Sequence, residues 1–309
     1  MGETLTAEVL FGINTIYTVR AEQGELTCRI KGKQLKEVGR AYNPIAPGDL
    51  VEVSPVGPGE GMICRLLPRR TTLARWNKKG RAPQVLAANA DVAVCVTSAV
   101  SPPFRPRFID RLIVAAEAGG LVPMVVLNKH DLPCPEEVRE RLGHYAGMGY
   151  DVLTCSAKTG EGVDGLAATL SGRTVVVVGQ SGVGKSSLLN AFDPDLGLRI
   201  GDISLKHDRG SHTTIVARLF VTGAGLRVID TPGVRELELA DVLPEEVGFH
   251  FRDFTAYMQD CAYQPCLHAD EPDCAVIAAV QRGEIHADRY ESYLRILAEL
   301  RESRKAAHG

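Results

Sequence analysis

The sequence predicts an α/β protein in three parts. We expect a central parallel sheet with helices, a small β-barrel of OB type before it and a mostly helical, zinc-binding part after it. Three observations support this: an apolar run followed by a Gly-rich loop at 174–187, about five short alternating strands before residue 70, and a cluster of three cysteines and one histidine near the end. A chain of 309 residues is too long for one small core, and we expect domains at 1–71, 72–238 and 239–309.

The stretch 174–187 has the pattern of a phosphate-binding loop. Four consecutive valines predict a strand buried on both faces, and the next residues match G-x-x-x-x-G-K-[ST]. Backbone N–H groups of such a loop and of the following helix bind phosphate oxygens, while Lys185 reaches the β- and γ-phosphates and Ser186 ligates Mg²⁺. The alternative to a phosphate-binding loop is a Gly-rich turn that matches this pattern by chance. The expected phosphate-binding residues are Gly179, Gln180, Ser181, Gly182, Val183, Gly184, Lys185, Ser186 and Ser187.

Two short strings predict that the base is guanine. Asn128-Lys129-His130-Asp131 follows the apolar run 124–127, and Ser156-Ala157-Lys158 follows a second expected strand at 151–155. Both lie where open α/β sheets bind ligands. A carboxylate there accepts the two N–H donors of guanine, which adenine lacks. GTP and GDP are therefore the expected nucleotides, with base contacts from Asn128, Lys129, Asp131, Ser156, Ala157 and Lys158.

The remaining nucleotide contacts are expected after the phosphate loop. A strand at 225–229 ends in Asp230-Thr231-Pro232-Gly233, where Asp230 is an expected outer-shell partner of Mg²⁺ and the Gly233 N–H an expected γ-phosphate sensor. Residues 193–214 have few large apolar side chains, which indicates a loop that Mg²⁺ and the γ-phosphate order. Its last hydroxyls belong to Thr213 and Thr214, and the residue types do not separate these two as the metal ligand.

The order of these strings is permuted relative to ordinary GTPases, because the guanine-reading strings precede the phosphate loop. This order resembles the ribosome small-subunit-dependent GTPase family (RsgA, also called YjeQ), and the resemblance covers nearly the whole chain. It implies a circularly permuted GTPase that hydrolyses GTP to GDP and phosphate, is stimulated by the small ribosomal subunit and acts in late subunit maturation. The implied partners are that subunit and its rRNA. The family pattern favours Thr214 over Thr213 as the Mg²⁺ ligand.

The catalytic group is a separate question. Ras-like enzymes place a Gln directly after the glycine of this last string, where it orients the attacking water. Here Val234 occupies that place and can neither donate nor accept a hydrogen bond. His212 is the candidate replacement, since members of the resembled family carry a His there; the alternative is a loop histidine without a catalytic role. The expected catalytic residues are His212, Lys185 and Thr214.

Near the C-terminus, the spacing Cys261-x4-Cys266-x-His268-x5-Cys274 predicts a metal site. Three thiolates and an imidazole suit tetrahedral Zn²⁺ and leave no position open, so one structural zinc ion is expected. A disulfide would leave an unpaired cysteine, and chance clustering is the other alternative. We expect the acidic residues within this loop to be solvated.

The flanking segments suggest an RNA partner. The expected strands of the barrel are 6–11, 16–21, 26–30, 50–54 and 62–67, a pattern typical of OB folds that bind oligonucleotides. From Arg65 to Arg81 there are seven Lys or Arg and no acid, with Trp76 placed to stack on a base; a solvated linker is the alternative. A helix beyond residue 286 has one apolar face, expected to dock on the zinc site, and basic residues on the rest.

No apolar run approaches the roughly 18 residues of a membrane span, and the N-terminus is no secretory signal. We expect a cytoplasmic monomer with no membrane partner. Two other hypotheses stay open: a zinc-containing RNA-binding protein in which GTP only holds the fold, and a GTPase that acts on tRNA or another ribonucleoprotein.

Overall fold

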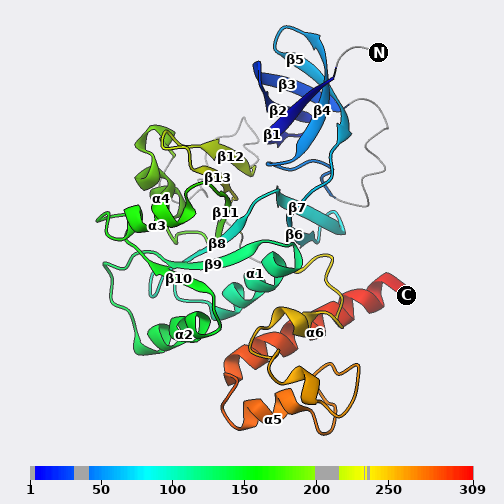
Figure 1. Ribbon diagram of the computed structural model, residues 1–309, viewed down its shortest axis with the longest axis vertical. Helices are drawn as coiled ribbons and strands as arrows, with labels where there is room; N and C mark the ends of the chain where they lie inside the picture. Colours follow the sequence, from blue (N-terminus) through cyan, green and yellow to red (C-terminus); the bar gives the residue numbers. More distant parts are fainter. Residues whose placement is uncertain (1–3, 31–41, 199–215, 233, 235–236, 309) are drawn as a thin grey trace.

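The computed structural model describes residues 4–30, 42–198, 216–232, 234 and 237–308. Figure 1 shows a barrel at the N-terminus, a helix-covered sheet in the middle and a mostly helical part at the C-terminus. Within the described ranges, no helix has both the length and the apolar character needed to cross a membrane.

The N-terminal part is a closed five-stranded barrel, as the alternating pattern predicted. Its strands follow the order β1-β2-β3-β5-β4, and alternate side chains such as Val9, Val19 and Ile63 fill its interior. The basic residues Lys31, Lys33, Lys36 and Arg40, which follow β3 in the sequence, lie outside the described residues. The barrel strands are β1 (Leu5–Ile13), β2 (Ile16–Ala21), β3 (Gly24–Ile30), β4 (Leu50–Gly57) and β5 (Glu60–Leu66).

The basic tract after the barrel is a hairpin rather than a linker. Its strands β6 (Thr72–Asn77) and β7 (Ala82–Ala88) pair with each other, and the Trp76 N–H donates to the carbonyl of Glu238 at 2.9 Å. The Trp76 side chain is partly exposed. This hairpin therefore joins the sheet region to the start of the C-terminal part.

The central sheet has six strands in the order β10-β9-β8-β11-β13-β12, all parallel except β12, which pairs antiparallel with β13. The wholly apolar strands β8 and β11 lie side by side in its middle, as buried strands of a parallel sheet must. The sheet strands are β8 (Val92–Thr97), β9 (Val122–Leu127), β10 (Asp151–Thr154), β11 (Thr174–Gly179), β12 (Arg218–Val221) and β13 (Arg227–Asp230).

Helices cover both faces of this sheet. On one face α1 (Pro106–Ala118) and α2 (Glu136–Gly147) pack in a core that continues into the C-terminal part. On the other face α3 (Val163–Leu170) and α4 (Lys185–Phe192) form a separate core with Val94, Val126 and Val177.

The barrel docks on the β12 edge of the sheet. The Arg218 guanidinium lies 4.5 Å from the centre of the Phe11 ring, and Arg227 forms an ion pair with Glu8 of β1. Gly48 permits a second close approach, to the end of β7: its φ is +86°, and a Cβ there would lie 2.1 Å from the carbonyl oxygen of Ala88. The barrel is thus fixed to the strands on either side of the turn at 222–226.

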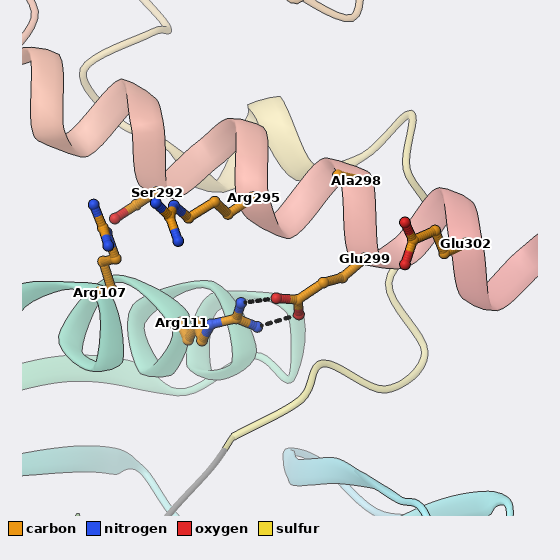
Figure 2. A pocket seen from close by; sticks show the side chains of 7 residues that line it. All are labelled: Arg107, Arg111, Ser292, Arg295, Ala298, Glu299 and Glu302. Atoms are coloured by element: carbon orange, nitrogen blue, oxygen red, sulfur yellow. Dashed lines mark hydrogen bonds and ion pairs between the residues drawn. The ribbon is translucent and has the colours of Figure 1, made fainter.

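The C-terminal part contains the 3₁₀ turns η3 (Val247–His250) and η4 (Met258–Asp260) and the helices α5 (Ala275–Gln281) and α6 (Ala287–His308). Tyr293 and Leu297 of α6 are fully buried, so its apolar face does dock, as the sequence predicted. Figure 2 shows α6 running along α1, with Arg111 of α1 paired to Glu299 of α6.

One residue of the expected basic face of α6 is not solvated. Arg289 is 1% exposed, and its Nη1 donates to Asp110 of α1 at 2.6 Å. Asp110 also accepts from the Tyr145 hydroxyl at 2.7 Å and from Arg141 at 3.0 Å, while Arg289 Nε donates to Asp253 at 3.0 Å. These buried charges join α1 and α2 to the C-terminal part.

We expect Arg289→Met to destabilise the protein by about 3 kcal/mol or more, because it leaves Asp253 without its cation and the fully buried Asp110 with Arg141 as its remaining cation. Urea unfolding measures this free energy. Arg295→Met on the same helix is the matched control: Arg295 pairs with Glu291 at the surface, and its loss should cost less than about 1 kcal/mol. Adding Asp253→Asn to Arg289→Met should recover part of the stability. Equal unfolding of the Arg289 and Arg295 variants would contradict this account.

Candidate functional site

The predicted nucleotide-binding strings meet at one edge of the sheet. Strands β9, β10, β11 and β13 are parallel, and their carboxyl ends lead into 128–131, 155–158, 180–184 and Asp230 respectively. From β8 the chain moves outward to β9 and β10, and from β11 it moves to the other side. The β8–β11 junction is therefore the topological switch point, where open α/β sheets bind ligands.

Two positions of the predicted phosphate loop require glycine because neighbouring atoms lie too close for a Cβ. Gly184, with a φ of +93°, precedes α4, and a Cβ there would lie 2.5 Å from Nδ2 of Asn128. A Cβ on Gly179 would lie 2.3 Å from the carbonyl oxygen of Val96. Because no side chain obstructs this turn, the loop can present its N–H groups together with the first turn of α4, which contains Ser186 and Ser187.

Lys185 and Asp230 form the charged part of the site. The Lys185 ammonium donates to the carbonyl of Gly179 at 2.7 Å and to that of Gln180 at 3.2 Å. Burial lowers the pKa of Lys185, and the negative charge of Asp230 opposes that shift. Burial also raises the pKa of Asp230 to about 6, against the pull of Lys185. Asp230 Oδ1 is buried and lacks a hydrogen-bond partner among the described residues, which suits a carboxylate that faces a hydrated cation.

The residues predicted to read guanine are held in place by one another. Asn128 is buried; its Nδ2 donates to the Val183 carbonyl at 2.9 Å, and its Oδ1 accepts from the Ala157 N–H at 3.0 Å. The Ser156 hydroxyl donates to Asp131 at 2.7 Å, and this bond is the main cause that lowers the pKa of Asp131. The carboxylate is thus oriented and ionised, as recognition of two guanine donors requires. Lys158 Nζ lies 3.8 Å from Asp131.

Four predicted site residues lie outside the described residues: His212, Thr213, Thr214 and Gly233. Their neighbour Val234 is described and is 3% exposed, as part of the large core to which α1 also contributes. A buried valine at this position cannot orient a water molecule, so the described part of the chain offers no substitute for the missing Gln there.

Residues 66–240 match the family described as RsgA GTPase. The chain belongs to the RsgA GTPase family. It is a GTP hydrolase with the circularly permuted order of that family. Among its relatives, the small ribosomal subunit biogenesis GTPase RsgA of Borreliella afzelii is 37% identical over 96% of this chain and 97% of its own length. The protein of the same name from Moorella thermoacetica is 42% identical over 92% of this chain and 93% of its own length.

Solved structures of RsgA-type proteins have the same architecture. YjeQ from Thermotoga maritima matches with a TM-score of 0.74 and 33% identity, covering 96% of this chain and 99% of its own. YloQ, described as a circularly permuted GTPase, matches with a TM-score of 0.69 and 30% identity, covering 97% of this chain and 96% of its own. The permutation inferred from motif order is therefore confirmed.

The predicted metal ligands converge in the C-terminal part. Cys261 Sγ lies 3.8 Å from Cys274 Sγ and 3.5 Å from His268 Nδ1. Cys274 Sγ lies 3.7 Å from Cys266 Sγ and 3.4 Å from His268 Nδ1. A tetrahedral centre with Zn–S near 2.3 Å and Zn–N near 2.0 Å needs edges of about 3.8 Å and about 3.5 Å. The four donors therefore fit one zinc ion, and His268 Nδ1 rather than Nε2 faces it.

The residues that hold this cluster in place were not predicted from the sequence. Glu271, expected to be solvated, accepts the N–H groups of Leu267 and Ala269, both at 2.9 Å. Burial alone would raise the pKa of Glu271, but these backbone donors outweigh it and lower the pKa to about 2. From α6, the Tyr290 hydroxyl donates to the His268 carbonyl at 2.8 Å, and that of Tyr293 to the Leu267 carbonyl. The signal that could have predicted the role of Glu271 was its place between two of the expected metal ligands.

Proposed function

We propose that this RsgA-family protein hydrolyses GTP during assembly of the small ribosomal subunit. The observation that carries the proposal is the near full-length similarity to proteins named small ribosomal subunit biogenesis GTPase RsgA, at 37% identity over 96% of this chain. Contact with the rRNA of that subunit, a late step of maturation, a monomeric state and a cytoplasmic location complete the proposal. The basic hairpin is the surface that fits RNA phosphates, and the closed barrel has a fold that is often used to bind oligonucleotides.

For the nucleotide site, the proposal assigns base recognition to Asp131 and phosphate binding to Lys185 and the N–H groups of 180–187. Ser186 and one of the two switch threonines would ligate Mg²⁺, with Thr214 preferred on the family pattern, and Asp230 would accept from the water shell of that ion. Mg²⁺, when bound, neutralises charge that develops on the phosphates. One structural Zn²⁺ would occupy the cluster of Cys261, Cys266, His268 and Cys274.

The proposal divides the chain at residues 71/72 and 238/239. The last nucleotide string then leads directly into the zinc domain, so that γ-phosphate sensing at Gly233 can change the affinity for a partner. Since Val234 cannot position water, we assign that role to His212.

The test is GTP turnover by the purified protein, alone and with small ribosomal subunits, for the wild type and His212→Ala. We expect strong stimulation by subunits that the variant loses. His207→Ala, in the same segment, is the matched control and should keep the stimulation. Stimulation that survives in His212→Ala would place the catalytic group on the partner. Absence of stimulation in the wild type would contradict the ribosomal role.

A further inference from the structure

The loop between β8 and α1, residues 98–105, borders the nucleotide site but contains none of the predicted strings. It follows β8, one of the two strands at the switch point. The loop is closed by its own bonds: the Ser98 hydroxyl donates to the Pro102 carbonyl at 2.7 Å, and the Phe104 N–H donates to the Ala99 carbonyl at 3.2 Å. Its shape is therefore set locally, at the carboxyl end of the sheet.

This loop contacts the guanine-reading string through Lys129. The Lys129 ammonium donates to the Ser101 carbonyl at 2.7 Å and to the Gly182 carbonyl at 2.7 Å. One cation thus joins three segments: the string that reads the base, the phosphate loop and the loop after β8. The phosphate loop also approaches Pro102, whose Cδ would lie 3.8 Å from a Cβ on Gly182.

The Ser98 hydroxyl determines where the Ser101 carbonyl points. Ser98 is 1% exposed, and its bond to the Pro102 carbonyl spans the turn that contains Ser101. Without that bond, the partly buried Pro102 carbonyl loses its donor, and the turn must relax to find another. A relaxed turn moves the Ser101 carbonyl away from Lys129 and leaves Gly182 as the only one of these two acceptors in place.

We propose that Ser98 is a positioning residue for guanine-nucleotide binding: it holds the loop after β8 so that Ser101 and Gly182 together keep Lys129 over the phosphate loop. This inference rests on the proposed GTP site and adds a residue to it. It acts through Lys129 and not by touching the nucleotide. Its loss should therefore accelerate nucleotide dissociation.

The experiment measures the affinity and dissociation rate of a fluorescent GDP analogue. For Ser98→Ala we expect about tenfold weaker binding, mainly through faster dissociation, the size of one well-placed hydrogen bond. Ser98→Thr keeps the hydroxyl and should restore most of the affinity. Ser292→Ala is the matched control, a buried serine on α6 whose hydroxyl has no partner among the described residues, and it should bind as the wild type does.

A double-mutant cycle with Lys129→Met separates positioning from general destabilisation. If Ser98 acts through Lys129, Ser98→Ala should weaken binding little further in the Lys129→Met background. Full additivity of the two effects would overturn the inference, and so would Ser98→Ala binding like Ser292→Ala while the wild type binds normally. If the wild type itself does not bind the GDP analogue, the proposed GTP site is wrong, and the inference is overturned with it.

Discussion

Replacing Lys185 by Met should lower kcat/KM for GTP by at least about 100-fold, the usual effect of losing one preorganised donor to a developing charge. The ammonium is nearly buried and bonded to the Gly179 and Gln180 carbonyls, so it is fixed before substrate arrives. Burial lowers the pKa of Lys185, and the negative charge of Asp230 opposes that shift. A methionine of similar length keeps the packing but supplies no donor and no charge.

The measurement is steady-state GTP hydrolysis, with nucleotide affinity determined separately. Lys79→Met is the matched control, since Lys79 is exposed in the β6–β7 turn, and its turnover without subunits should equal that of the wild type. The assignment fails if Lys185→Met hydrolyses GTP within about fivefold of the wild type. A loss of affinity alone, with turnover at saturation retained, would restrict Lys185 to ground-state binding.

The sequence was sufficient for the sheet and its ligand edge because each signal is local. An apolar run and the polar string after it fix a strand and its loop, whatever the order along the chain. Parallel pairing then brings all the loops to one edge, as Asn128, Lys185 and Asp230 illustrate. The cluster that could hold zinc was predictable for the same reason: Cys261 and Cys274 are separated by only a short loop.

What the sequence did not reveal depends on tertiary contacts. Arg289 has the same side chain as the surface arginines of α6, and only the packing of α6 on α1 shows that it meets Asp110. Glu271 looks like a solvated acid until the loop folds its N–H groups around it. The loop after β8 contacts Lys129 through the backbone carbonyl of Ser101. Every residue has such a carbonyl, so the residue types in this loop could not predict the contact.

Removing the zinc ion should unfold the C-terminal metal loop, since such sites contribute about 10 kcal/mol or more of folding free energy. Between Phe251 and Cys274 the chain forms turns and a single 3₁₀ turn, with no longer element to hold it without metal. The core of α3 and α4 is separate from this region, so GDP binding should survive. Zinc content, limited proteolysis after chelation and binding of a fluorescent GDP analogue measure these effects.

Cys274→Ser tests the same site without a chelator. Because Cys274 belongs to the proposed zinc cluster and also precedes α5, its loss should release zinc and expose the C-terminal part to protease. Cys134→Ser, outside the cluster, should retain one zinc per chain. If the wild-type protein contains no zinc and its C-terminal part still resists protease, then aromatic packing around Tyr293 is enough to keep that part folded. Loss of GDP binding on chelation would instead show that the metal loop stabilises α1, through which Arg289 and Asp110 join the two parts.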